Sequence, residues 1–358
     1  MTARVQILLG TKKGAFILES DATRREWTVR GPFGETWSMQ HLIRSKSDGA
    51  LYAGGGSAWY GASVWRSDDD GTTWTQSSEG LTYGDDGPKL IKVWNITPSN
   101  GTLYAGVEPA GLFRSQDSGR TWSHVSGLRD HPTTPEWQPG NGGLCLHSIV
   151  PHPTDSQRMW VGISAVGAFE TIDGGATWET RNKGVRADFN PDPNPVFGQC
   201  VHKMHVHPDH PEVLYQQNHC GVYRSDDGGR AWTEITPGLP SQFGFPLALH
   251  PHDPSTIYVI PLNGDDKGRH MLDGKAAVWR SRDRGDSWTR LSNGLPQDHA
   301  YLGVLREAMA MDALETPGIY FGTSTGQVFG SSDEGENWTL IADFLPSISS
   351  VETALVGD

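Results

Sequence analysis

Short runs of alternating apolar and polar residues recur along the chain, and turn-forming residues separate them. One stretch shows the pattern clearly, with runs at residues 92–97, 103–107, 112–115 and 121–125. An alternation with a period of two is typical of β-strands that bury one face. The second run of this stretch returns elsewhere as LYAGG, MWVGI, LYQQN, IYVIP and IYFGT. The pattern therefore predicts repeated units of four antiparallel strands, which is the design of a β-propeller.

An eight-residue box, Ser/Thr-x-Asp-x-Gly-x-Thr/Ser-Trp, accompanies each unit. Successive boxes start 47 to 56 residues apart, and such a period is typical of propellers and repeat arrays. The copies start at Ser20, Ser67, Ser115, Thr171, Ser225, Ser281 and Ser331, and the first keeps only its Ser and its Trp.

The residue types of the box suit a tight turn that is anchored by a buried aromatic ring. An aspartate accepts hydrogen bonds from nearby backbone N–H groups, glycine supplies a positive φ, and tryptophan buries a large flat surface. A calcium loop would need a distal Glu and flanking helices, which the pattern lacks. We therefore interpret the box as a folding device. Its aspartates are Asp69, Asp117, Asp173, Asp227, Asp283 and Asp333.

The two ends of the chain are expected to share one sheet. The first repeat supplies only three strands, whereas an apolar run at 349–356 remains after the last box. This run would provide the missing strand. The fold prediction is an all-β, seven-bladed β-propeller of four-stranded antiparallel blades, in one domain over residues 1–358. Blade one would then consist of residues 1–30 and 346–358.

The box and its period resemble the BNR or Asp-box propellers over essentially the whole chain. That family includes sialidases, xyloglucan-acting glycosidases, sortilin-type receptors and a photosystem II assembly factor. The resemblance implies the fold strongly and the function weakly, because one fold hosts unrelated sites. The family's sialidases carry an Arg-Ile/Leu-Pro segment ahead of the boxes, whereas the nearest match here is Arg30-Gly31-Pro32, after the first box. Sialidase activity is therefore not expected.

The composition narrows the classes of partner and the location. The chain has 358 residues and a formal net charge of −13, which disfavours a nucleic-acid partner. No apolar run approaches the roughly 18 residues of a membrane span, so no membrane partner is expected. Three cysteines and an N-terminus unlike a signal peptide predict a cytoplasmic protein with free thiols.

The long, irregular loops should lie on the face opposite the boxes, because the boxes join third and fourth strands. Long loops on a rigid scaffold usually carry the site, so we predict a pocket on that face, called the loop face below. The predicted ligand-binding residues are Trp37, His41, Lys92, Trp94 and Arg306.

Catalysis would need groups able to move protons or to form a covalent intermediate. The candidates are Glu307, His147 and His202. A glycosidase needs two carboxylates about 5–10 Å apart. Glu108, Glu136 or Asp265 would be the partner of Glu307.

Two Cys-x-His pairs, Cys145–His147 and Cys200–His202, occupy equivalent entries to adjacent inner strands. Residues two apart on a strand face the same way, so each pair can share a face. Thiolate with imidazole suits zinc, and Cys beside His also suits an activated nucleophile. Simple burial of the cysteines is the third alternative.

These features predict a pocket for a carbohydrate or another small polar ligand, compatible with a glycosyl hydrolase-like activity. A non-catalytic scaffold with a protein partner on the loop face is the alternative. A metal- or His-dependent lyase or lactonase is a further alternative. The sequence requires no cofactor, although it is compatible with a divalent metal.

Overall fold

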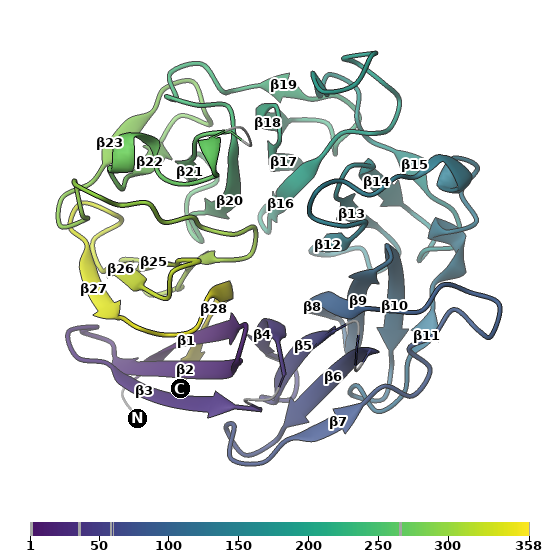
Figure 1. Ribbon diagram of the computed structural model, residues 1–358, viewed down its shortest axis with the longest axis horizontal. Helices are drawn as coiled ribbons and strands as arrows, with labels where there is room; N and C mark the ends of the chain where they lie inside the picture. The colour runs from purple at the N-terminus through teal and green to yellow at the C-terminus, as the bar shows by residue number, and fades with distance from the viewer. Residues whose placement is uncertain (1–2, 35–36, 58, 60, 265–266, 358) are drawn as a thin grey trace. The chain divides into compact units, whose positions relative to one another are not determined.

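The computed structural model describes residues 3–34, 37–57, 59, 61–264 and 267–357. In these residues the strands form seven four-stranded sheets, which we number as blades 1 to 7 in chain order (Figure 1). The fold is therefore the predicted seven-bladed β-propeller. The chain divides into two compact units, Met1–Leu42 with Ile235–Asp358 (unit 1) and Ile43–Glu234 (unit 2). A single domain over the whole chain stays a prediction.

Unit 1 contains blades 1, 6 and 7. The strands of blade 1, in sheet order, are β28 (Ile348–Val356), β1 (Arg4–Thr11), β2 (Gly14–Asp21) and β3 (Thr28–Phe33). Blade 6 consists of β20 (Gly244–Leu249), β21 (Ile257–Pro261), β22 (Val278–Ser281) and β23 (Thr289–Leu291), and a short 3-10 helix, η4 (Leu272–Gly274), precedes β22. Blade 7 consists of β24 (Met309–Met311), β25 (Ile319–Gly322), β26 (Val328–Ser331) and β27 (Thr339–Ala342).

Unit 2 contains blades 3, 4 and 5 and most of blade 2. Blade 2 consists of β4 (Met39–Arg44), β5 (Leu51–Ser57), β6 (Gly61–Ser67) and β7 (Thr75–Ser77). Blade 3 consists of β8 (Lys92–Ser99), β9 (Thr102–Glu108), β10 (Gly111–Ser115) and β11 (Ser123–His124), followed by η1 (Ser126–Leu128) and η2 (Thr134–Glu136). Blade 4 consists of β12 (Leu146–Pro151), β13 (Met159–Ile163), β14 (Gly167–Thr171) and β15 (Glu179–Thr180). Blade 5 consists of β16 (Val201–His207), β17 (His210–Asn218), β18 (Gly221–Ser225) and β19 (Thr233–Glu234).

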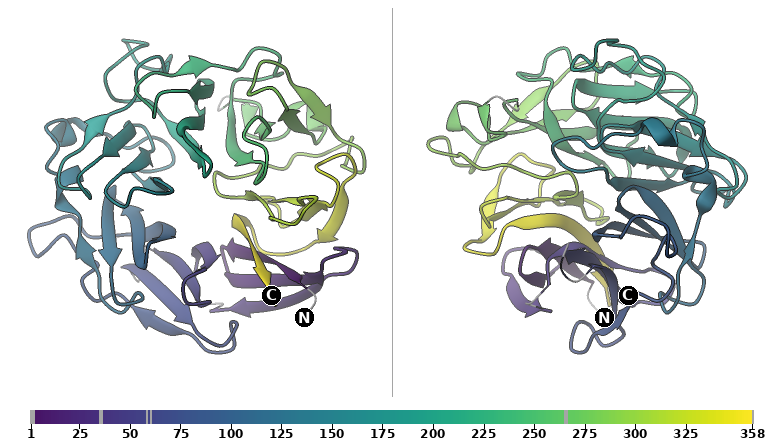
Figure 2. Two further views of the ribbon diagram at one scale, coloured as in Figure 1. Left: turned by 180° about the vertical axis from the view of Figure 1, so that it is seen from behind. Right: turned by 45° about the vertical axis from the view of Figure 1, so that its right-hand side comes forward.

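The C-terminal strand completes blade 1, as the leftover apolar run predicts. β28 pairs antiparallel with β1, from Arg4 opposite Val356 to Thr11 opposite Ile348. Figures 1 and 2 both show the yellow β28 beside the purple β1. Apolar residues on both strands are fully buried, Ile7 and Val351 among them, so the pairing belongs to the core of unit 1.

Each full box closes with the same hydrogen bonds. In blade 3, the Ser115 hydroxyl donates to Asp117 (2.8 Å), and Asp117 accepts from the backbone N–H (2.9 Å) and the hydroxyl (2.7 Å) of Thr121. The box of blade 7 replaces the hydroxyl with the Asn337 amide, which donates to Asp333 at 2.7 Å. The aspartate carboxylate thus accepts its hydrogen bonds within its own turn, as a structural role requires.

Acid should weaken the boxes. Hydrogen bonds from Thr121 and Thr177 lower the pKa of Asp117 and of Asp173 to about 2, from 3.8. A carboxylate with a lowered folded-state pKa stabilises the fold above its unfolded pKa, and this contribution is lost as pH falls through the folded value. We therefore expect the double variant Asp117→Asn/Asp173→Asn to lose less melting temperature than the parent between about pH 5 and pH 2. Thermal melts followed by circular dichroism measure this, and equal slopes would contradict it.

The box tryptophans differ in burial. All six were expected to be largely buried, and Trp122, Trp178, Trp232 and Trp338 are each at most 5% exposed. Trp74 and Trp288 are half-buried. Trp288 still donates its indole N–H to the carbonyl of Ile235 at 2.9 Å.

Among the described residues, no helix is long and apolar enough to span a bilayer.

Candidate functional site

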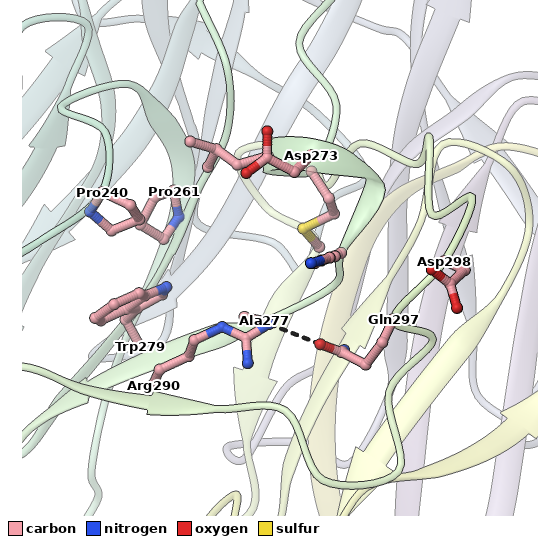
Figure 3. A pocket seen from close by; sticks show the side chains of 11 residues that line it. Pro240, Pro261, Asp273, Ala277, Trp279, Arg290, Gln297 and Asp298 are labelled. Carbon is pink, nitrogen blue, oxygen red and sulfur yellow. Dashed lines mark hydrogen bonds between the residues drawn. The ribbon is translucent and has the colours of Figure 1, made fainter.

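A cavity of about 610 Å³ opens in unit 1, at blade 6 (Figure 3). The half-buried Trp279 of β22 provides one wall, and η4 contributes Asp273. The η4 turn needs left-handed backbone at Asp273 (φ 54°) and at Gly274 (φ 65°). The eleven residues that line the cavity are Pro240, Pro261, Met271, Leu272, Asp273, Lys275, Ala277, Trp279, Arg290, Gln297 and Asp298.

Hydrogen bonds fix one side of this blade 6 cavity. The guanidinium of Arg290, on β23, donates to the side-chain oxygen of Gln297 at 2.7 Å, as the dashed line in Figure 3 shows. The amide nitrogen of Gln297 in turn donates to the carbonyl of Ala276 at 2.8 Å. Two side-chain cations, Lys275 and Arg290, balance the two carboxylates of the wall. The cavity is therefore polar without a net charge, and it offers one flat aromatic face.

The blade 6 cavity takes part of its wall from two long connections, because Asp273 lies before β22 and Gln297 lies after β23. None of the five predicted ligand-binding residues lines it. Trp279 and Arg290 were missed because they lie on strands β22 and β23, where no motif marks a binding residue. Asp273 and Asp298 were missed because nothing in their loops distinguishes them from the other charged residues.

The predicted ligand-binding residues fall into separate groups. In unit 2, the Lys92 ammonium lies 4.7 Å from the Trp94 ring centre and 3.6 Å from a Glu108 oxygen. The Trp94 indole N–H donates to the same carboxylate at 2.9 Å. In unit 1, Arg306 is 9% exposed and its guanidinium lies 4.8 Å from the Phe245 ring centre. Trp37 is half-buried, and its carbonyl accepts from the backbone N–H of Gly14 at 2.8 Å.

Glu307, which lies just before β24 (Met309–Met311), meets two residues of strands in unit 1. His41 (β4), Glu307 and Glu352 (β28) each place a ligand atom within 4.8 Å of the others. His41 Nε2 lies 3.3 Å from Glu352 Oε1. The first two side chains are buried, whereas that of Glu352 is 34% exposed and connects the group to solvent. We call these three residues the carboxylate pair with His41. Glu352 was missed because the C-terminal run was assigned only a structural role.

Glu307 does not meet its predicted carboxylate partners in this group. Glu108 contacts Lys92 and Trp94 instead, and Glu136 lies exposed on η2. Asp265 lies outside the described residues.

A second group of possible ligands lies in unit 2. Cys200, His202 and His219 each place a donor atom within 4.8 Å of the others. We call these residues the Cys-His-His cluster. The other predicted pair is not in it: His147 Nε2 lies 2.9 Å from the carbonyl of Val201, and Cys145 is fully buried. The equivalent Cys-x-His pairs of blades 4 and 5 therefore have different surroundings.

Known proteins that resemble the chain include xyloglucanases. No protein-family model matches the chain. A xyloglucanase of Paenibacillus sp. is 28% identical over 262 residues, which are 64% of this chain and 23% of that enzyme. The chain thus spans less than a quarter of that relative.

Solved structures extend the likeness to the whole fold. A Niastella koreensis GH74 enzyme aligns with a TM-score of 0.65 at 19% identity, over 94% of this chain and 52% of that one. YCF48 bound to D1 peptide aligns with a TM-score of 0.54 at 13% identity, over 94% of this chain and 88% of that one. At these identities the likeness shows the fold alone. The protein is thus a seven-bladed propeller similar to GH74 xyloglucanase-like propellers.

Proposed function

We propose that the protein binds a carbohydrate in the blade 6 cavity. The observation that carries the proposal is the combination of Trp279 with four charged side chains of balanced sign and a fixed glutamine. Sugar rings present apolar C–H faces, which an aromatic ring covers, and hydroxyl groups, which charged and amide side chains bind. The similarity to a xyloglucanase supports this ligand class. The recurring hydrogen bonds of the boxes support an assignment to the BNR/Asp-box propellers.

Trp279→Ala should lower the affinity for the bound sugar at least about tenfold, which corresponds to about 1.4 kcal/mol. A glycan array that includes xyloglucan oligosaccharides selects the ligand, and calorimetry then measures the dissociation constants. Trp59→Ala removes a 90% exposed tryptophan outside the cavity and is the matched control. Unchanged affinity in Trp279→Ala, or no glycan bound by the parent, would refute the cavity as a sugar site and leave the scaffold interpretation.

We propose glycoside hydrolysis by Glu307 and Glu352 as a second function. Their convergence from separate segments of unit 1 supports it, because retaining glycosidases hold two carboxyl groups about 5 Å apart. The more exposed Glu352 would attack the sugar carbon and form the glycosyl-enzyme bond, and His41, 3.3 Å away, would orient it. Glu307 would protonate the leaving oxygen and then take a proton from the water that hydrolyses the intermediate. The oligosaccharides that bind in the array are then tested for cleavage. Turnover should disappear in Glu307→Gln with unchanged sugar affinity, and it should persist in Glu108→Gln.

A further inference from the structure

We propose that the Cys-His-His cluster binds one zinc-class divalent cation in blade 5. The cluster lies wholly within unit 2, whereas the proposed sugar cavity and the carboxylate pair lie in unit 1. The metal-site proposal can therefore fail or succeed independently of the proposed sugar binding and hydrolysis.

Strand pairing brings the three donors together. β16 and β17 lie side by side (Figure 1). They are antiparallel, with Val201 opposite Asn218. One residue beyond this pair, past the ends of the two strands, Cys200 lies opposite His219, and the His219 N–H donates to the Cys200 carbonyl at 2.9 Å. The register shifts between Val201 and Lys203, so the intervening His202 is the extra residue of a bulge. Bulges commonly re-aim a side chain, and here the imidazole of His202 joins the cross-strand pair.

The neighbours of the cluster hold its side chains in place. The Ser164 hydroxyl lies 3.6 Å from the Cys200 sulfur. The His219 ring packs edge-on against His202, with ring centres 5.5 Å apart, and against Phe189 at 5.1 Å. Ligands held by packing and outer hydrogen bonds lose less freedom when an ion binds.

The donor set selects the ion. One thiolate and two imidazoles suit zinc, cobalt and related ions, whereas magnesium and calcium prefer oxygen ligands. Typical zinc bond lengths place tetrahedral donors about 3.3–3.6 Å apart, so donors within 4.8 Å need only small side-chain rotations. Three protein ligands leave a fourth position for water, which is the arrangement of catalytic zinc sites. Cys200 and His202 are buried, and the half-buried His219 provides the open side.

Cobalt(II) titration of the chelator-treated full-length protein tests the site. We expect about one equivalent to bind with a thiolate-to-cobalt absorption band, zinc to displace it, and magnesium and calcium to have no effect. Cys200→Ser should abolish the band. His219→Ala should weaken binding by more than the roughly 10- to 100-fold that loss of an outer-shell partner costs. Elemental analysis of the purified parent and its variants gives the zinc content independently.

Blade 4 offers a matched control, because Cys145→Ser alters the cysteine of the equivalent Cys-x-His pair without removing the His147 contact to the Val201 carbonyl. This variant should retain the parent's cobalt band and affinity. A parent without a thiolate band at excess cobalt would overturn the proposal, and so would a band that survives Cys200→Ser but disappears in Cys145→Ser. Should Cys200→Ser not fold, the parent spectrum and His219→Ala decide: an unchanged cobalt affinity in His219→Ala overturns the site.

Discussion

Removal of residues 346–358 should abolish the cooperative folding of unit 1 or lower its melting temperature by more than about 10 °C. The deletion removes β28, which pairs with β1 along its whole length. It also removes the fully buried Ile348 and Val351 from the core. Each buried aliphatic side chain contributes about 1.5–3 kcal/mol, a large part of a total stability near 5–15 kcal/mol.

The same deletion leaves polar groups without their partners. The Met311 carbonyl loses the hydrogen bond that it accepts from the Thr353 hydroxyl (2.7 Å), and the Gly10 N–H loses its acceptor, the Ser350 hydroxyl (3.2 Å). A truncation after Val356 keeps β28 intact and is the control. Adding a peptide of residues 346–358 should restore the melt by β-strand addition, which separates loss of the strand from general damage. A 346–358 deletion that melts like the parent would show that closure by β28 is dispensable.

The strand order was predictable because the signals that specify it are local. In blade 3 the runs at 92–97, 103–107 and 112–115 become β8, β9 and β10 with boundaries within two residues. The fourth strand is shorter than predicted, at Ser123–His124, because Thr121 and Trp122 belong to the box turn. The C-terminal strand was predictable for another reason: four strands complete a blade, and one blade lacked a strand.

The sites were less predictable because they depend on register and loop conformation. The Cys-x-His spacing identified Cys200 and His202, but the position of His219 follows from the pairing of β16 with β17 and from a bulge. Glu352 reaches His41 only because β28 joins blade 1. The blade 6 cavity depends on the left-handed turn of η4, which no repeat of the pattern indicates.

Replacement of Trp338 with alanine should destabilise the protein by about 3–5 kcal/mol, the range for large aromatic residues removed from a core. Trp338 is 3% exposed, and its ring packs against Phe321 with ring centres 5.3 Å apart. Its backbone N–H donates to the Asn293 carbonyl at 2.9 Å, a bond that alanine keeps. The cost should therefore arise from the lost ring and the cavity it leaves. Urea unfolding at constant pH measures it.

Trp288→Ala is the matched comparison, because it removes the tryptophan of the blade 6 box. Trp288 is only half-buried, so its loss should cost clearly less, even though its indole N–H no longer binds the Ile235 carbonyl. Sugar and metal affinities, measured under conditions where each variant is folded, should match those of the parent. A Trp338→Ala protein that keeps its stability but loses ligand binding would contradict the structural role of the boxes, because a folding device can affect function only through the fold it holds.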